Sequence, residues 1–385
     1  MGYVPRAGGI RPEAFVENFL HIFFIWLHIL GVALFVGPQF FLAFAWVPAS
    51  RTIDDMTTRI KAMRTITRRF GYVGGVGLAL IVIAGSYLVG TWRSFYSQPD
   101  DVGFMDLRFG VVFIVIGIAF KFGAAPFHAW VPDVYQGSPT GVTLFVASAP
   151  KVAAFGMAYR LLDNGFGTPA LWSQWSAMLS VLAVLSLVIG NVVAIAQTNL
   201  KRMLAYSTIS HVGFLLLGII GGGADGFGAA LFYATTYSIT TVAAFGLIVL
   251  LSRSGFEAEE IEDFRGLNQR NPFYAFLMLV VMASFAGVPL FVGFLAKLQV
   301  LKAVIRADAL WLAIAGGLFA VVGAFYYLRV IKVMYFDEPA AHAPVIAQPD
   351  AGFRLVLAAN VLALIGLGIF GGPLMTWCLS AVAAS

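Results

Sequence analysis

The chain has 385 residues, of which 60% are hydrophobic and 11% charged, and its mean hydropathy is +0.88. Soluble domains carry roughly 25% charged residues, so this composition excludes a soluble domain. The single cysteine, Cys378, excludes a disulfide framework and a multi-cysteine metal or iron–sulfur site. The net charge of +5 does not indicate a nucleic-acid partner, because most basic residues lie at the ends of apolar runs.

Long apolar runs predict an all-α, polytopic transmembrane bundle of about ten spans. A run of ~20 apolar residues crosses a bilayer with its backbone polar groups bonded inside one helix. Helix breakers interrupt three runs, at Gly37-Pro38, Ala125-Pro126 and Gly287-Val288-Pro289, and broken helices are expected around 121–132 and 287–297. The expected spans are residues 19–46, 70–92, 107–127, 141–162, 171–197, 203–222, 226–251, 272–305, 309–336 and 353–380.

Basic residues give the orientation and a polar loop gives the division of the chain. The 49–69 loop, Lys201 with Arg202, and the 253–270 segment are basic and lie on one side if ten spans are counted. The positive-inside rule makes that side cytoplasmic, so both termini are expected to be periplasmic. The polar loop at 93–106 predicts a two-span module, residues 1–106, followed by an eight-span module, residues 107–385.

Three lysines inside the expected spans are candidate proton carriers. An intramembrane charge costs about 2.5–3.5 kcal/mol on insertion scales, so each lysine requires an explanation. Lys151, directly after Pro150, lies about ten positions from either end of its span, which is too far for easy snorkelling. Lys121 and Lys297 lie closer to span ends or breaks, so snorkelling competes more strongly with a functional reading. A row of lysines that lose and regain protons would carry them sideways.

Two histidines extend this candidate pathway. His211 lies near the middle of the sixth expected span, where a relay role and a plain interhelical hydrogen bond account for it equally well. His128, between Pro126 and Asp133, is expected at a loop or at the mouth of a half-channel. None of the 19 acidic residues lies inside an expected span, so the lysines lack a carboxylate partner.

Several motifs, in order, resemble subunit N of the respiratory NADH–quinone oxidoreductase, complex I. The resemblance covers about residues 107–385 and implies a proton-translocating, antiporter-like membrane subunit. Within it, Asp133-Val-Tyr-Gln-Gly differs from the Asp-Ala-His typical of subunits L and M and of cation/proton antiporters. The matching segments are Phe120-Lys-Phe-Gly-Ala-Ala-Pro-Phe-His-Ala-Trp-Val-Pro-Asp-Val-Tyr-Gln-Gly-Ser-Pro139, Ala149-Pro-Lys-Val-Ala-Ala-Phe-Gly156, Gly190-Asn-Val-Val-Ala-Ile-Ala-Gln197, Lys201-Arg-Met-Leu-Ala-Tyr-Ser-Thr-Ile-Ser-His211, Ser284-Phe-Ala-Gly-Val-Pro289, Gly293-Phe-Leu-Ala-Lys297 and Tyr326-Tyr-Leu-Arg-Val330.

The resemblance implies roles for the three lysines. Lys121 is similar to the lysine of the family's broken seventh helix, Lys151 to that of the eighth and Lys297 to that of the broken twelfth. In that family they form a hydrophilic axis along the membrane mid-plane. Pro126, Pro150 and Pro289 are the expected breaks. The chain would be a non-redox translocase subunit that binds no cofactor itself. NADH and quinone would be used elsewhere in the complex, and its partners would be the other membrane subunits and the lipid bilayer.

The sequence departs from this family before residue 107. Family members have about fourteen helices, with six before the first lysine, whereas two spans precede Lys121 here, and the family's paired glutamate is missing. Residues 19–92 weakly resemble copper-resistance-D-type, haem-handling membrane proteins. His21 and His28 are seven residues apart and share a helix face, so they are candidate haem or copper ligands, although packing or hydrogen bonding also accounts for them. No other metal site is predicted.

Three readings of function stay open. The first is a bacterial inner-membrane subunit that moves protons through a lysine relay. The second is a structural or assembly protein of the same family that does not conduct, which the lack of intramembrane carboxylates favours, with a cation/proton antiporter-type subunit as a variant. The third is a haem or copper membrane protein using His21 and His28.

Overall fold

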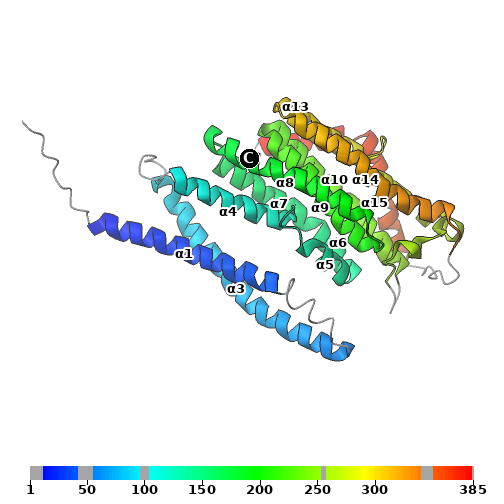
Figure 1. The fold of residues 1–385 in the computed structure, drawn as a ribbon, viewed down its shortest axis with the longest axis horizontal. Helices are drawn as coiled ribbons and strands as arrows, with labels where there is room; N and C mark the ends of the chain where they lie inside the picture. The colour runs from blue at the N-terminus through cyan, green and yellow to red at the C-terminus, as the bar shows by residue number, and fades with distance from the viewer. Residues whose placement is uncertain (1–11, 42–54, 96–103, 253–256, 340–349, 384–385) are drawn as a thin grey trace, which may run out of the picture. The chain divides into compact units, whose positions relative to one another are not determined.

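A computed structural model describes residues 12–41, 55–95, 104–252, 257–339 and 350–383. These ranges are almost entirely helical, and their β-type pairing is confined to an isolated bridge between Asn199 and Glu260 (Figure 1). The predicted all-α class is therefore confirmed. The chain divides into two compact units, Met1–Leu107 and Arg108–Ser385.

The first unit is an antiparallel pair of helices, α1 (Pro12–Phe41) and α3 (Met56–Phe95). The two helices touch at glycines: a Cβ on Gly31 would lie 2.8 Å from the Gly77 carbonyl oxygen, and a Cβ on Gly77 would lie 2.7 Å from that of Gly31. Small residues at such crossings let transmembrane helices approach at backbone distance.

Both helices of this unit begin before the expected spans, and residues 42–46 of the first expected span lie outside the described residues. The helix α1 continues through Gly37 and Pro38 to Phe41, so the expected interruption is wrong; transmembrane helices tolerate proline when neighbours satisfy the freed carbonyl. The helix α3 begins at Met56, within the basic segment expected to be a loop. Residues 56–70 contain neither glycine nor proline and include good helix formers such as lysine, arginine and methionine.

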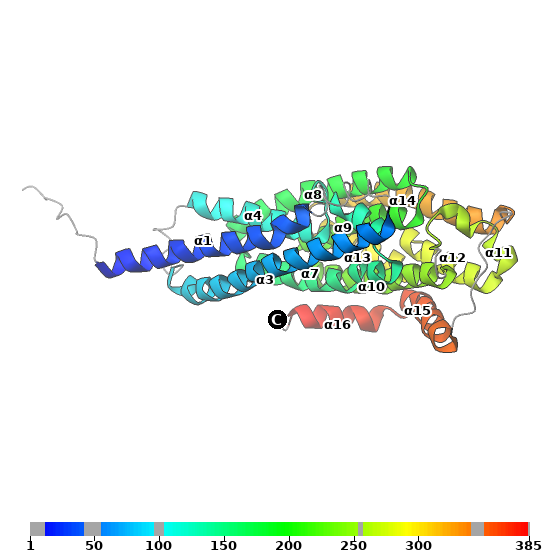
Figure 2. The ribbon, with the colours of Figure 1, turned by 90° about the horizontal axis from the view of Figure 1, so that it is seen from below.

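The second unit is a bundle in which α8, α9 and α10 run side by side (Figure 1). Other helices, several of them short or broken, surround this centre, and in Figure 2 the last helix lies along α10. Its elements are α4 (Phe104–Phe122), α5 (Trp130–Gly137), α6 (Thr140–Ala147), α7 (Ala149–Tyr159), the π turn η2 (Arg160–Gly165), α8 (Pro169–Ile195), α9 (Leu200–Gly221), α10 (Gly223–Leu251), the 3-10 turn η3 (Ile261–Phe264), α11 (Leu267–Arg270), α12 (Pro272–Ala286), α13 (Val292–Arg306), α14 (Leu310–Phe336), α15 (Ala351–Ile369) and α16 (Gly372–Ala383).

The helix α9 is the core of this bundle. In α9, 94% of the most apolar stretch is buried, against 33% in α14 and 17% in α15. The outer faces of α14 and α15 are left for lipid or neighbouring chains. Close approach to α8 depends on small residues, since a Cβ on Gly190 would lie 2.5 Å from the Ser210 backbone nitrogen and one on Gly213 2.9 Å from the Ala183 carbonyl oxygen.

Seven of the described helices are long and apolar enough to cross a membrane, and four shorter apolar helices accompany them. This confirms a polytopic membrane protein. The tenth expected span, residues 353–380, is wrong as one helix, because α15 ends at Ile369 and α16 starts at Gly372. The Gly371-Gly372-Pro373 triplet was the available signal, since glycine and proline both disfavour a helix interior.

The expected breaks in the third and eighth spans are present but shorter than predicted. One turn separates α4 from α5, beginning at Gly123 with φ +77°. The other, Gly287–Phe291, separates α12 from α13 and begins at Gly287 with φ +84°. In the fourth expected span, α6 gives way to α7 at Ser148. Each break frees carbonyls at the end of the preceding helix.

Candidate functional site

Lys151 lies in the first turn of α7 with only 4% of its surface exposed. Its Nζ donates a hydrogen bond to the carbonyl of Phe122, the last residue of α4. The last carbonyls of a helix have no partner inside it, so the lysine satisfies one end of a broken helix. Pro150 precedes it at the start of α7, where a missing backbone N–H does not remove a helical bond.

Lys297 repeats this arrangement at the second break. It is 7% exposed, and its Nζ donates to the carbonyls of Phe285 at 2.9 Å and Ala286 at 3.0 Å, the last residues of α12. A Cβ on Gly287 would lie 3.0 Å from Lys297 Cδ, so glycine provides both the turn and the space. Lys297 lies in α13 and not in the break itself, while Pro289 lies in the break.

His211, on α9, is buried between two hydroxyl groups. Its Nδ1 lies 2.7 Å from the Tyr233 hydroxyl on α10, and its Nε2 lies 3.0 Å from the Tyr327 hydroxyl on α14. Each nitrogen of a neutral imidazole needs a different partner, one an acceptor and the other a donor, and a hydroxyl serves as either. The histidine therefore makes interhelical bonds and also has a bonded exit for a proton on each side of its ring.

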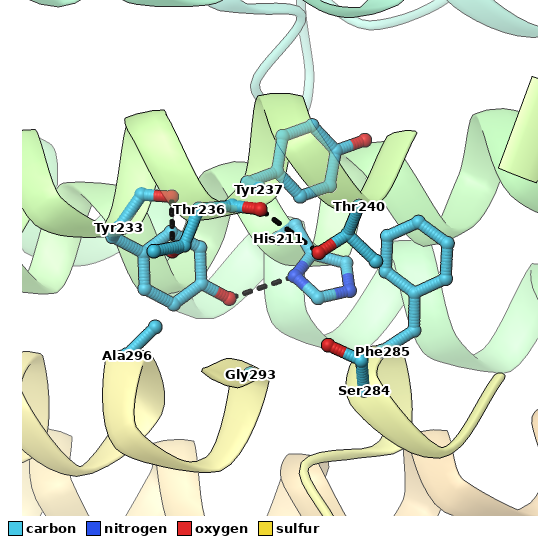
Figure 3. Close-up of a pocket in the computed structure, with 9 residues that line it drawn as sticks. All are labelled: His211, Tyr233, Thr236, Tyr237, Thr240, Ser284, Phe285, Gly293 and Ala296. Carbon is cyan, nitrogen blue, oxygen red and sulfur yellow. Dashed lines mark hydrogen bonds between the residues drawn. The ribbon is translucent and has the colours of Figure 1, made fainter. Parts of the chain in front are cut away.

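Two small hollows flank this histidine, each about 10 Å³ in volume. One reaches Ser284 and Gly293 at the second break, and Figure 3 shows the Ser284 hydroxyl facing the His211 ring across it. The other hollow is bordered by Lys151. His211, Tyr233 and Tyr237 line both. The hollow that reaches Ser284 exposes polar atoms and has room for roughly one water molecule, whereas the hollow beside Lys151 exposes only apolar surface.

The other predicted pathway residues lie outside this buried row. Lys121 is in the last turn of α4 and its side chain is exposed. It precedes Phe122, whose carbonyl binds Lys151, and lies close enough to Lys151 for the two charges to repel each other. His128 lies in the turn between α4 and α5, half-buried, with its ring 6.4 Å from that of Tyr206 on α9. Pro126 lies in the same turn.

One of the two candidate metal ligands, His28, makes a contact between helices. His28 Nδ1 lies 3.2 Å from the Ile81 carbonyl oxygen, a contact between α1 and α3 that corresponds to the packing interpretation. The side chain of His21 lies outside the described residues.

Within the long spans of the described chain, carboxylates lie only near the ends. The seven long apolar spans contain Asp163 and Asp225, each within a turn of an end. Asp225 pairs with Arg306 at 2.5 Å. Lys151 and Lys297 are therefore held by neutral carbonyls.

An ionic cluster at the N-terminal end of α9 was missed in the sequence. Lys201 is fully buried and pairs with Glu257 at 2.9 Å and Glu259 at 3.1 Å, although it was expected in a loop. Burial raises the pKa of the Glu257 carboxyl, but hydrogen bonds from Lys201 and Thr140 outweigh it and lower the pKa to about 2. No local pattern joins residues 56 positions apart, so the sequence offered no signal for this pair.

The tyrosines and the asparagine around His211 were also missed as site residues. Tyr326 and Tyr327 belong to one motif that resembles the family, and Asn191 follows Gly190 in another, but neither motif shows which helices meet. A polar side chain near the middle of an apolar span was the available signal, since such groups need a partner inside the bundle.

The fold and the buried row together define a polytopic helical membrane protein whose broken helices present lysines to the bundle interior. The family described as the NADH:quinone oxidoreductase/Mrp antiporter transmembrane family matches residues 80–323, more than half of the chain. The chain belongs to this family. The match begins inside α3, earlier than the sequence resemblance at residue 107 indicated.

Relatives and solved structures agree with this family. The chain is 58% identical over 274 residues to NADH-quinone oxidoreductase subunit N of Xanthomonas euvesicatoria, covering 71% of this chain and 56% of the relative. It is 55% identical over 310 residues to that of Thiobacillus denitrificans, covering 80% and 63%. The chain thus spans about three fifths of the length of these relatives.

The fold is shared with a chain of respiratory complex I from Thermus thermophilus with bound aureothin. The TM-score is 0.63 at 29% identity, over 80% of this chain and 69% of that one. A chain of the Mrp complex from Dietzia, 18% identical, matches 96% of this chain and 67% of that one with a TM-score of 0.64, which shows the fold alone.

Proposed function

We propose that the chain is a membrane subunit of a proton-pumping NADH–quinone oxidoreductase of the subunit N type. It moves protons along the row Lys151–His211–Lys297 in a bacterial inner membrane. Quinone reduction and NADH oxidation belong to other subunits, and this chain binds no redox cofactor of its own. Its partners are the other membrane subunits of that complex. The relatives' identity supports this assignment.

The pairing of Lys151 and Lys297 with the freed carbonyls of broken helices is the observation that carries the proposal. A carbonyl accepts a hydrogen bond without fixing the ammonium form as a carboxylate would, so these lysines are able to lose and regain a proton. His211 lies between hollows that border Lys151 on one side and the α12–α13 break on the other. The row therefore runs from Lys151 past His211 to the second break, with room for a bridging water on the side of that break.

Replacing Lys151 with methionine tests the proposal. In vesicles holding the chain with its neighbouring subunits, NADH-driven proton uptake should fall at least about tenfold, because the relay loses a proton-carrying group. NADH oxidation by an artificial acceptor should persist. The control is Lys302→Met, which removes an exposed lysine from α13 and should leave uptake unchanged. Full pumping by Lys151→Met would refute the assignment.

A membrane protein of this family that does not conduct protons is the second candidate. It is favoured by the exposed Lys121 and by the confinement of carboxylates to span ends in the described chain. Under this candidate, proton uptake would be the same for Lys151→Met and Lys302→Met. Uptake that requires a sodium gradient would instead favour an antiporter-type subunit.

A further inference from the structure

A chain of hydroxyl groups leaves His211 on the side facing α14, away from both hollows. Tyr327 contacts His211 Nε2 and also hydrogen-bonds Ser207 on α9. Its neighbour Tyr326 lies 3.4 Å away, hydroxyl to hydroxyl. Tyr326 in turn donates a hydrogen bond of 3.1 Å to Asn191 Oδ1 on α8. Connected hydroxyls of this kind transfer protons. The Tyr327–Tyr326 pair, which we term the hydroxyl arm, is therefore a side branch of the proposed row.

The hydrogen bonds of Asn191 fix the direction of its amide. Its Nδ2 donates to the Leu187 carbonyl at 2.8 Å and to Ser210 Oγ at 2.9 Å. A backbone carbonyl only accepts, so the atom facing Leu187 must be the nitrogen. The oxygen therefore faces Tyr326 and accepts the single hydroxyl hydrogen of that tyrosine. All of these side chains are at most 3% exposed.

An amide at this position ends the arm. It neither takes up nor releases a proton at neutral pH, in contrast to the imidazole of His211 or a carboxylate. Because the Tyr326 hydrogen is committed to Asn191 Oδ1, Tyr326 is not free to donate to Tyr327. Beyond Asn191, α8 continues for about one turn, or roughly 6 Å, to Ile195, whose carbonyl accepts from Arg329 at that end of the helix.

Two glycines hold the amide in this pose. A Cβ on Gly323 of α14 would lie 2.7 Å from Asn191 Oδ1, so any side chain there would displace the oxygen. A Cβ on Gly190 would lie 2.5 Å from the Ser210 nitrogen, so glycine keeps α8 close enough for the Asn191–Ser210 bond. The position of the Asn191 amide thus depends on close packing of α8 against both α9 and α14.

We propose that Asn191 is a proton barrier: its amide closes the Tyr327–Tyr326 arm and confines protons to the row Lys151–His211–Lys297. This inference rests on the proposed function of that row. A carboxylate at the same position would accept the Tyr326 proton while Tyr326 is reprotonated by Tyr327 and Tyr327 by His211 Nε2. His211 would regain a proton at Nδ1 through the Tyr233 hydroxyl, and the row would supply that proton. The carboxylic acid would then release its proton to water at the end of α8, which is a leak.

The test measures passive proton flux into liposomes that carry the full chain, under an imposed pH gradient with valinomycin and potassium. Asn191→Asp should raise the flux about tenfold, since it turns the barrier into a proton acceptor of equal size. The double variant Asn191→Asp with Tyr327→Phe keeps the carboxylate but cuts the arm, so its flux should return to that of the parent. Asn191→Leu, which cannot carry a proton, should also match the parent.

An unchanged flux in Asn191→Asp would overturn the barrier role, and so would a raised flux that Tyr327→Phe does not abolish. Both variants carry the same buried carboxylate, so a general folding defect would affect them equally and cannot mimic the expected difference. Lys151→Met on the parent chain decides the proposed function separately. If Lys151→Met had the same flux as the parent chain, the relay would be refuted. The Asn191 variants test the barrier alone.

Discussion

Lys201 and Arg202 follow one another in the chain, yet their environments differ. Lys201 is fully buried and pairs with two glutamates, whereas Arg202 is partly exposed and pairs with Asp133 at 2.8 Å. Neighbouring residues of a helix point about 100° apart, so one faces the bundle and the other its rim. Composition alone placed both in a basic loop.

We predict that Glu257 stabilises the fold in a pH-dependent manner. Its pKa is lowered from 4.5 to about 2, so its contribution is present above about pH 4.5 and is lost as the pH falls towards 2. Glu257→Gln should lower the thermal midpoint at pH 7, by the equivalent of about 1 kcal/mol or less because the carboxylate is partly exposed and Glu259 still pairs. The difference from the parent should shrink on acidification.

The control for this prediction is Glu262→Gln, since Glu262 is exposed and lies 3.6 Å from Arg265. Its midpoint should follow the parent at every pH. Thermal unfolding in detergent between pH 3 and pH 7, followed by circular dichroism, measures all three proteins. If the difference in thermal midpoint between the parent and Glu257→Gln stayed the same from pH 7 to pH 3, the prediction would be contradicted.

At the scale of elements, the helix breaks are what place the lysines. A continuous helix satisfies its carbonyls internally, and a broken one leaves its last carbonyls for another group. Lys151 bonds the end of α4 and Lys297 the end of α12, so two separate breaks use the same arrangement. The breaks themselves need glycine, at Gly123 and Gly287, because both have positive φ.

We predict that Gly293→Ala disrupts the second break. A Cβ there would lie 1.8 Å from the Ser284 carbonyl oxygen, so α13 must shift away from α12. Overpacking of this kind costs about 1–3 kcal/mol, and the Lys297 bonds to the end of α12 should be lost with it. Both the thermal midpoint and proton uptake should fall.

Gly317→Ala is the matched control, because Gly317 lies in α14 with open space around its Cβ position. Alanine there should be neutral or stabilising by about 0.5–1 kcal/mol. If Gly293→Ala has the same thermal midpoint and the same proton uptake as Gly317→Ala, the break does not depend on this contact.

At the scale of the whole molecule, charged clusters mark the two ends of the second unit. Asp133–Arg202 and Lys201 with its glutamates lie at the N-terminal end of α9, while Asp225–Arg306 lies at the opposite end, where α9 passes into α10. Such pairs belong in the interfacial regions, since charges at the centre of a bilayer are costly. We propose that this first end, which carries more lysine and arginine, faces the cytoplasm.

We predict opposite labelling of single cysteines at the two ends. Ala224→Cys should react with a membrane-impermeant maleimide in intact cells, whereas Glu262→Cys should react only after permeabilisation. Both positions are exposed, and the native Cys378 is fully buried, so it contributes little background. The reverse labelling pattern would show that the chain has the opposite orientation in the membrane.

The sequence by itself determined the membrane class, most helices, the main breaks and two of the three lysines that are buried in the described chain, Lys151 and Lys297. These follow from local properties: the length of apolar runs, the conformational freedom of glycine and the cost of a charge in hydrocarbon. Only the tertiary structure decided the partners of those lysines, the exposure of Lys121, the pairing of Lys201 with Glu257 and the closure of the hydroxyl arm by Asn191. Those features depend on which helix faces meet, and a hydrogen bond between residues 135 positions apart, such as Tyr326 to Asn191, leaves no trace in local patterning.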